Sequence, residues 1–436
     1  MTSLVIRGGS IVRSHEVVRA DVVVVDGRVL EVGEKVNAPA GAREIDASGA
    51  WVGPGFVDLH THLREPGLEA AETVESGARA AAVGGYCAVV AMPNTEPALD
   101  TVALVSYVLA RGALTGIDVA VAGAITQGRR GEKLAPLAEM AALGVRIFTD
   151  DGAAVASAEV MRRALSYAKP LGVRLAQHCE EPSLVEFGSM NEGALAGRLG
   201  LVGRPALAEE LMVVRDIELV RASGASVHFL HLSTARSIAL VVAARREGLD
   251  VTCEVAPHHF SLDESACRTY DPHYKVNPPL RSPGDAAALV AALQRGDVDA
   301  VATDHAPHLP ESKDLAFDEA PAGMLGLEHA ASLTVEALGA DGDPRAFFAL
   351  LSRGPARIAQ LRASDVRVGL SAHGGEVAVG EDANLVVFDP GVEWTVDRDR
   401  LQSRATNTPY HGRTLHGRAR ATIARGRLIA ENGEMC

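Results

Sequence analysis

The chain contains 436 residues, of which 42 are basic and 56 are acidic, so its formal net charge is −14. This charge argues against a nucleic-acid-binding protein, which normally presents a basic surface to phosphates. Hydrophobic residues make up 47% of the chain and charged residues 22%, a globular composition that allows a sizeable core. The five cysteines are scattered without a CxxC pair, no signal-peptide pattern is present, and the apolar runs are too short to span a bilayer. We therefore expect a cytoplasmic protein with neither disulfides nor a membrane partner.

Both ends of the chain are predicted to form short strands. Apolar runs bounded by turn signals occupy residues 4–7, 21–25, 29–32, 384–388, 421–424 and 428–430. Asp26-Gly27 is a strong hairpin signal, and Asp389-Pro390 is expected to close the strand before it. The two β-rich ends predict one small β-sandwich domain, assembled from residues 1–53 and 365–436.

The middle of the chain alternates between apolar runs and alanine-rich helical stretches. Eight strand-like runs occupy residues 55–59, 88–92, 119–125, 145–148, 173–176, 227–232, 251–256 and 298–302. Helical patterns between them include residues 73–83, 159–168 and 206–220. The average spacing is about 35 residues, the size of a βα unit, and eight such units in about 250 residues are typical of a (β/α)₈ TIM-like barrel. We expect this barrel to span residues 54–364, with insertions before His231 and Asp304.

Chemically active side chains stand where the predicted strands end, which is where barrel enzymes place their catalytic residues. Five of the eight strands stop on histidine or aspartate, at His60 and His62, at Asp150 and Asp151, at His178, at His231 and at Asp304. An HxH pair alone is a weak signal, because packed or exposed histidines are common. The repeated placement at strand ends is the stronger one.

Four imidazoles and two carboxylates suit a pair of divalent metal ions, with zinc as the first choice. A carboxylate is well suited to bridge the two ions, and Asp151 lies midway in the set; the adjacent Asp150 points to the other face, so only one of the two can be a ligand. Because His228 and His231 differ by an odd number, we assign the ligand to His231 and expect His228 to face the helices. A metal pair lowers the pKa of its bound water, and a nearby carboxylate has to carry the proton; Asp304 is the candidate.

With these residues assembled, the sequence resembles class I dihydroorotases of the amidohydrolase superfamily over essentially the whole chain. The resemblance rests on GFVDLHTHLREPG at 55–67, MPNT at 92–95, KVNPPLR at 275–281, TDHAPH at 303–308 and GMLGLE at 323–328. It implies the reversible cyclisation of N-carbamoyl-L-aspartate to L-dihydroorotate, a small anionic substrate pair of de novo pyrimidine (UMP) biosynthesis.

The resemblance also implies roles for individual residues. His60, His62 and Asp304 match the ligands of one metal, His178 and His231 those of the other, and Asp151 matches the bridge. The positions that match substrate-binding residues of the family are Arg64 and Asn94 for the carboxylate, Asn277 and His308 for the ring, and the Pro321-Ala322-Gly323 loop, whose Ala322 and Gly323 would act through backbone groups. His258 and His259 receive no role.

Two alternatives stay open. Another cyclic amidase, such as a hydantoinase or allantoinase, is disfavoured because many of these enzymes bridge their metals with a carboxylated lysine at the end of the fourth strand, where this chain has Asp151. A non-catalytic partner of aspartate transcarbamoylase is expected to have lost metal ligands, whereas all six are present here. Intact ligands do not exclude a complex with that partner, and we also expect a homodimer.

Overall fold

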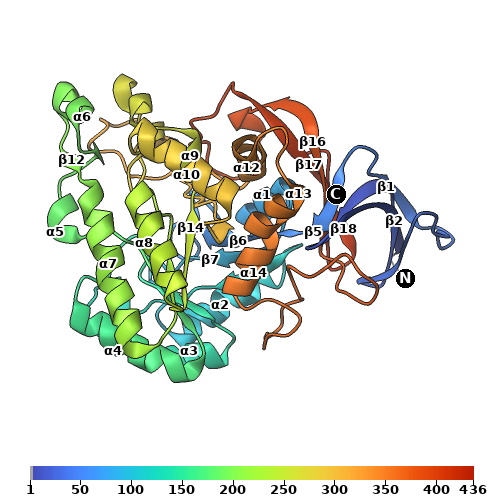
Figure 1. Cartoon of the computed structure of the whole chain (residues 1–436), viewed down its shortest axis with the longest axis horizontal. Helices are drawn as coiled ribbons and strands as arrows, with labels where there is room; N and C mark the ends of the chain where they lie inside the picture. The colour runs from blue at the N-terminus through green and yellow to red at the C-terminus, as the bar shows by residue number, and fades with distance from the viewer. Residues whose placement is uncertain (1–2) are drawn as a thin grey trace.

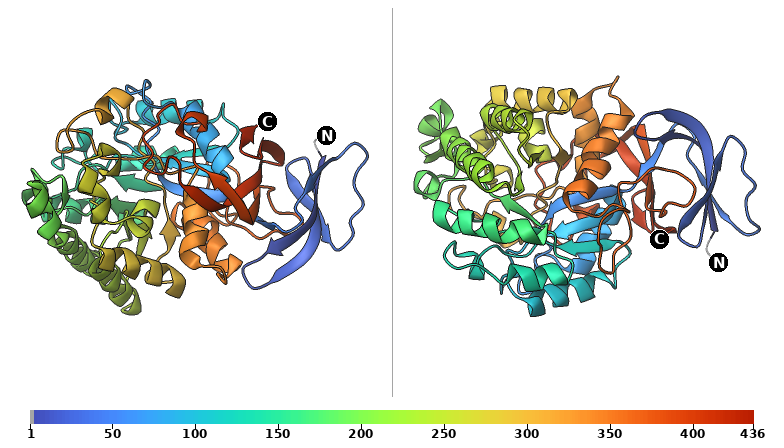
Figure 2. Two further views of the ribbon diagram at one scale, coloured as in Figure 1. Left: turned by 90° about the horizontal axis from the view of Figure 1, so that it is seen from above. Right: turned by 60° about the horizontal axis from the view of Figure 1, so that its bottom comes forward.

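Strands from the two ends of the chain share one sheet in the computed structural model, which describes residues 3–436 (Figure 1). Its nine strands are β1 (Ser3–Val12), β2 (Val17–Val25), β3 (Arg28–Gly33), β4 (Arg43–Asp46), β5 (Trp51–Pro54), β16 (Leu385–Thr395), β17 (Thr414–Ala424), β18 (Arg427–Glu431) and β19 (Glu434–Met435). The sheet runs in the order β19-β18-β17-β16-β5-β1-β2-β3, and β4 pairs with β1. The antiparallel β5–β16 pair, with Val52 opposite Val387, joins the two ends of the chain. Both termini consequently lie at the same end of the molecule (Figure 2).

One strand boundary differs from our expectation. Asp389-Pro390 does not close a strand, because β16 continues to Thr395. The pairing with β17 shifts register between Asp389 and Glu393, so the proline occupies an irregular stretch of the ladder where its missing N–H is tolerated.

Each of the eight apolar runs in the middle of the chain overlaps a parallel strand. A three-stranded sheet consists of β6 (Phe56–Thr61), β7 (Tyr86–Ala91) and β8 (Asp118–Val121). A five-stranded sheet consists of β9 (Ile147–Thr149), β10 (Arg174–Gln177), β13 (Val227–Phe229), β14 (Val251–Val255) and β15 (Ala300–Val301). Isolated parallel bridges link the two sheets, Gly123 with Phe148 on one side and Thr61 with His305 on the other.

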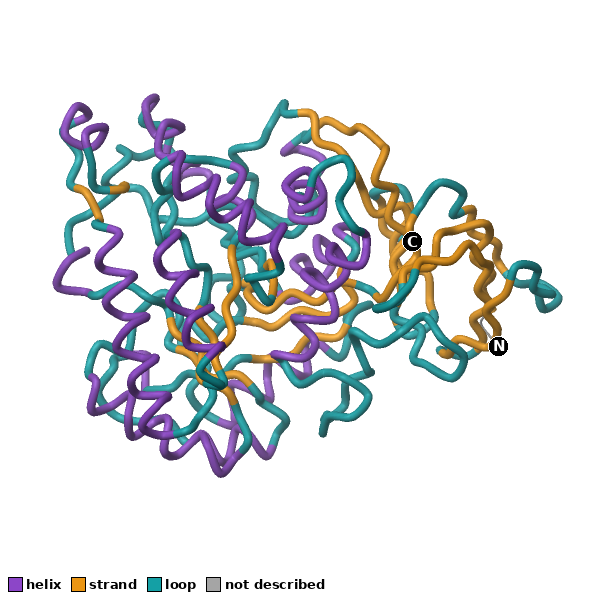
Figure 3. The backbone as a smooth tube through the Cα atoms, viewed as in Figure 1, coloured by secondary structure: helices purple, strands orange, loops and turns teal. Residues whose placement is uncertain are grey.

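Helices flank these strands (Figure 3). They are α1 (Val74–Gly84), α2 (Val102–Gly112), α3 (Leu137–Ala142), α4 (Ala158–Leu171), α5 (Pro182–Val185), α6 (Ala194–Leu199), α7 (Ala206–Ser223), α8 (Ala235–Arg246), α9 (Pro257–Ser261), α10 (Pro283–Arg295), α11 (Pro310–Lys313), α12 (Ala330–Leu338), α13 (Pro344–Phe348) and α14 (Gly354–Ile358). The predicted helices at 73–83, 159–168 and 206–220 correspond to α1, α4 and α7. A capping box at Thr73 begins α1, and Gly85, with φ 97°, ends it. Within the described residues, no helix is long and apolar enough to cross a membrane.

Short elements fill the predicted insertions. Helices α5 and α6 and the two-stranded pair β11 (Met190–Asn191) and β12 (Gly203–Arg204) precede α7, and α9 and α10 precede β15. They lengthen the intervals before His231 and Asp304, as their spacing predicted.

Candidate active site

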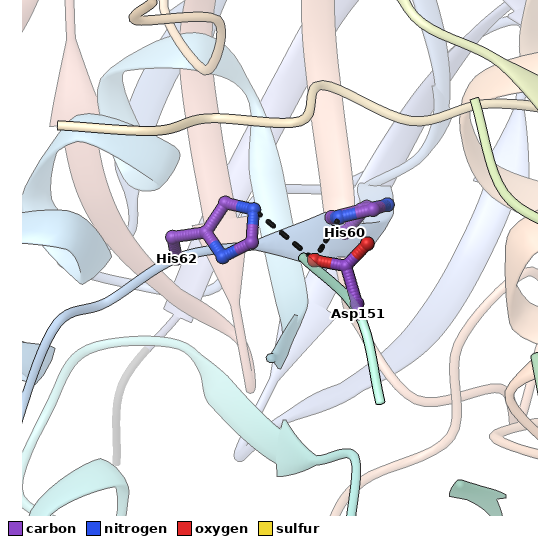
Figure 4. A group of neighbouring side chains, drawn as sticks. All are labelled: His60, His62 and Asp151. Atoms are coloured by element: carbon purple, nitrogen blue, oxygen red, sulfur yellow. Dashed lines mark ion pairs between the residues drawn. The ribbon is translucent and has the colours of Figure 1, made fainter. Parts of the chain in front are cut away.

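The histidine pair at the end of β6 faces a carboxylate from the end of β9 (Figure 4). His60 Nε2 lies 3.1 Å from Asp151 Oδ2, and His62 Nε2 lies 3.5 Å from the same oxygen. All three side chains are buried. Their donor atoms lie close enough together to hold one metal ion.

A second group uses the other oxygen of Asp151. His178 Nδ1 lies 3.5 Å and His231 Nε2 lies 3.4 Å from Asp151 Oδ1. Burial opposes the ionisation of Asp151, but the neighbouring His60, His178 and His231 side chains hold the pKa of its carboxyl well below the usual range. A single ionised carboxylate therefore faces both groups, which is the geometry of a bridging ligand.

Hydrogen bonds on the far sides of the rings turn the donor atoms toward Asp151. His60 Nδ1 lies 2.9 Å from Glu254 Oε1, and His178 Nε2 lies 3.0 Å from Glu180 Oε2. The inward atoms His60 Nε2 and Asp151 Oδ1 are buried without a hydrogen-bond partner. Imidazole that is oriented by an outer carboxylate is a typical metal ligand. The donor set fits two divalent cations.

Asp304 joins the first group from the segment after β15. Its Oδ1 lies 3.1 Å from His62 Nε2 and 3.5 Å from His60 Nε2, and its backbone is held at φ 47°. Its Oδ2 lies 3.9 Å from His258 Nε2. Asp304 therefore stands beside the cluster, with one oxygen facing the histidine pair.

The adjacent Asp150 faces away from the cluster. Its carboxylate accepts hydrogen bonds from the Thr126 backbone N–H, at 2.9 Å, and from the Thr126 hydroxyl. Only Asp151 lies in the two groups of potential ligands. The contacts thus distinguish two neighbours between which spacing alone could not choose.

The expectation that His228 faces the helices is wrong. Its neighbours Val227 and Phe229 belong to the core packed with the helices, whereas His228 lies on the other side of β13 and contacts Thr252 Oγ1 at 2.8 Å and Glu254 Oε2 at 2.9 Å. The expectation failed because it assumed that side chains alternate between faces as far as His231. Strand β13 ends at Phe229 and His231 has φ 31°, so the alternation stops before His231.

A cavity of about 250 Å³ opens beside this cluster. Of the twelve residues predicted for the site, all except the fully buried His60 line it. They are His62, Arg64, Asn94, Asp151, His178, His231, Asn277, Asp304, His308, Ala322 and Gly323. The fold therefore brings residues from more than 250 positions apart along the sequence into one pocket.

Arg64 supplies a cation to this cavity. Burial lowers the pKa of its guanidinium to about 10, which leaves it charged at neutral pH. Its Nε donates to Pro307 O at 3.1 Å, which fixes the direction of the side chain. His62 Nδ1 lies 2.7 Å from Asn94 Oδ1; with that oxygen accepting from the ring, the Asn94 amide N–H groups remain as donors.

His308 is positioned by backbone. Its Nε2 donates to Ala322 O at 2.8 Å, so this nitrogen carries the proton. Burial, reinforced by the charge of Arg64, lowers the pKa of His308 to about 3, so the ring is neutral. His259 Nε2 donates to Pro278 O at 2.9 Å and supports the segment that carries Asn277.

Sequence reasoning missed the two glutamates behind the histidines. Glu254 is the one charged residue in the apolar run of β14, a signal that could have marked it. Glu180 follows His178 by two residues and is held by Arg204 Nη1 at 2.9 Å. Neither could be paired with its histidine without the fold.

Comparison with known proteins decides the family. A Dihydro-orotase-like family model matches residues 49–237. The chain is 44% identical to "Dihydroorotase" of Pelotomaculum thermopropionicum, covering 98% of this chain and 99% of that protein. It is 46% identical to "Dihydroorotase" of Mycobacterium leprae, with 98% of both chains covered. This chain belongs to the dihydroorotase family.

Solved structures show that the dihydroorotase family fold of this chain is shared with other cyclic amidases. An L-hydantoinase (dihydropyrimidinase) from Arthrobacter aurescens superimposes with a TM-score of 0.88 at 23% identity, covering 100% of this chain and 98% of that one. A D-hydantoinase from a Thermus species superimposes with a TM-score of 0.81 at 27% identity, covering 99% and 96%. Sequence identity thus favours dihydroorotase over hydantoinase, while the fold is common to both.

Proposed function

We propose that this protein is a metal-dependent cyclic amidohydrolase that interconverts L-dihydroorotate and N-carbamoyl-L-aspartate. The observation that carries the proposal is the buried, charged Arg64 in the cavity beside the Asp151 cluster. Both compounds carry a carboxylate, and a fixed guanidinium binds a carboxylate strongly and with a defined geometry. An unsubstituted hydantoin has no such group and would leave Arg64 without a partner.

The metal ions are proposed to be two zinc ions. His60, His62 and Asp304 would hold one ion, His178 and His231 the other, and Asp151 both. Bound there, such ions lower the pKa of water and polarise a carbonyl oxygen.

The chain's own residues would orient the substrate and move the proton. Arg64 and the Asn94 amide are placed to hold the carboxylate, Asn277 and the neutral His308 to contact the ring, and the Ala322-Gly323 backbone to close the cavity. Asp304, beside the cluster, would carry a proton between the attacking water and the ring nitrogen that leaves. With two divalent ions bound beside Arg64, the pocket would be locally positive, so a chain of net charge −14 could accept an anion there.

The activity test compares dihydroorotate with unsubstituted hydantoin and measures metal content. We expect turnover of dihydroorotate and about two zinc ions per chain; preference for the hydantoin, or protein that binds no metal, would contradict the proposal.

Replacing Arg64→Met should lower kcat/KM for dihydroorotate on the order of 100-fold with unchanged metal content. Arg163→Met, on exposed α4, is the matched control.

The strand pairing and the apolar packing favour a barrel with a small β domain. We infer that the two parallel sheets close into a (β/α)₈ barrel, because the two isolated bridges join both pairs of sheet edges. The apolar cluster of Ile6, Val22, Val52, Leu385 and Ile423 supports a small sandwich-like β domain from the two ends. We propose domain limits of 1–53, 54–364 and 365–436.

The proposed assembly is inferred from the family resemblance, and the proposed location from the scattered, unpaired cysteines. We propose a cytoplasmic homodimer that can associate with aspartate transcarbamoylase. Light scattering of the purified chain, alone and mixed with aspartate transcarbamoylase, tests both interactions. A monomeric mass for the chain alone would contradict the homodimer, and a mixture that shows only the masses of the two separate proteins would contradict the association.

A further inference from the structure

A buried asparagine in the connection between β16 and β17 binds the backbone of residues that line the cavity. Asn407 is 2% exposed and does not line the cavity. It belongs to the part of the chain that returns to the nine-stranded sheet, yet its contacts are with the loops that follow β15. None of the roles assigned above involves it.

The side-chain amide of Asn407 acts both as a hydrogen-bond donor and as a hydrogen-bond acceptor. Its Nδ2 donates to Ala306 O at 3.0 Å and to Gly323 O at 3.2 Å. Its Oδ1 accepts from the His308 backbone N–H at 3.0 Å. One amide therefore links two loops that contribute separately to the cavity.

The linked loops carry the ring-side and backbone contacts proposed for the substrate. His308 Nε2 donates to Ala322 O, and the Gly323 N–H donates to Lys275 O at 2.8 Å, so the three segments form a connected network. The direct backbone contact between the loops lies further back, where Ala306 N–H donates to Met324 O at 2.9 Å. Asn407 adds three side-chain hydrogen bonds beyond that contact, and they tie the His308 backbone to the Gly323 carbonyl.

We propose that Asn407 is a positioning residue, which holds His308 and the Gly323 backbone in the geometry that binds substrate. The inference rests on the proposed function, because it assigns Asn407 to the substrate pocket of that reaction. Because His308 and Gly323 are proposed substrate contacts, loss of their preorganised geometry weakens substrate binding.

Asn384 provides a matched control. It is 4% exposed, its Nδ2 donates to Ser371 Oγ and Ala372 O, both at 2.8 Å, and its Oδ1 accepts from Arg425 N–H at 2.7 Å. Asn384→Ala therefore removes the same number of buried hydrogen bonds at a place remote from the cavity. A loss of thermal stability that both variants share can therefore be distinguished from an effect of Asn407→Ala on substrate binding.

The kinetic test compares Asn407→Ala with Asn384→Ala. We expect KM for dihydroorotate to rise about tenfold in Asn407→Ala, with kcat changed less than about threefold, and KM to stay within about twofold of wild type in Asn384→Ala. An unchanged KM in Asn407→Ala, or equal changes in both variants, would overturn the inference. Should Asn407→Ala fail to fold, Asn407→Asp keeps the acceptor but replaces the two donors, and its KM should rise as well.

Hydrogen exchange of the His308 amide tests the inference without activity. Exchange should be at least about tenfold faster in Asn407→Ala than in wild type or Asn384→Ala, and Asn407→Asp should retain protection. Equal exchange in wild type and Asn407→Ala refutes the positioning role. Failure of wild type to turn over dihydroorotate refutes the proposed function instead, so the two failures are distinct.

Discussion

Asp150 and Asp151 are adjacent in sequence but have different partners. Asp151 faces histidines from several strands, whereas both oxygens of Asp150 are occupied by Thr126. We predict that Asp151→Asn loses at least half of the bound metal and about 100-fold or more in kcat, because the bridging charge is removed. Asp150→Asn should keep its metal content. Elemental analysis of purified proteins checks this, and normal metal content in Asp151→Asn would contradict the bridge.

Two features of position 323, its backbone conformation and its close neighbours, favour glycine over any residue with a Cβ. Its φ is +134°, and an added Cβ would lie 2.7 Å from Ala306 Cβ and 2.9 Å from His308 Nε2. Gly323→Ala should therefore displace His308 and raise KM about tenfold. Gly197 in α6 has no atom within 4 Å of an added Cβ, so Gly197→Ala is the control. Equal KM values for the two variants would refute this role.

At the scale of elements, strand β14 supports the end of β6. Glu254 places one oxygen 2.9 Å from His60 Nδ1 and the other 2.9 Å from His228 Nε2. Burial opposes the charge of Glu254, but the hydrogen bonds from His228 and His60 lower the pKa of its carboxyl to about 2. Strand β14 thus places the buried Glu254 carboxylate behind His60 of β6.

We predict that Glu254→Gln weakens metal affinity by about 10- to 100-fold, because the His60 ring loses its charged partner. Competition with a chelator measures the affinity. Glu209 is a matched control, since it is equally buried but accepts from Ser233 and Thr234 at the start of α8. Glu209→Gln should lower stability while leaving metal affinity unchanged, and equal affinities for both variants would contradict the prediction.

At the scale of the whole molecule, Asp118 ties β8 to the segment that leads into β16. His373 Nε2 lies 2.8 Å from Asp118 Oδ2, and the Ser371 N–H donates to the same oxygen at 2.9 Å. Burial would raise the pKa of Asp118, but His373 and Ser371 outweigh it and lower the pKa to about 2. A carboxyl whose pKa is depressed in the folded state stabilises the fold above its unfolded pKa, and that stability is lost as the pH falls through the folded pKa.

Asp118→Asn should therefore lower the free energy of unfolding by about 2 kcal/mol at pH 7. The difference from wild type should shrink between about pH 4 and pH 2, where wild-type Asp118 becomes protonated. Urea unfolding at several pH values measures it, with exposed Asp341→Asn as the control. A difference that is independent of pH would contradict this assignment.

The sequence alone was sufficient where the signal is local. His60, His62 and Arg64 stand in one short stretch at a strand end, and the eight apolar runs each form a strand. Apolar patterning and short spacing are properties of neighbouring residues, so they can be read before the chain folds. Family resemblance then extended the prediction to Asn94, Asn277 and His308, which all line the cavity.

Only the tertiary structure decided which residues meet across strands and between the two parts of the chain. It separated Asp151 from Asp150, corrected the direction of His228, and placed Glu254 behind His60 and Asn407 behind His308. These contacts depend on strand register, on where a strand stops and on the path of a distant connection, and none of these is encoded in local spacing. The −14 charge was likewise a fact of composition, whereas the burial of Arg64 in the cavity beside Asp151 is a consequence of the fold.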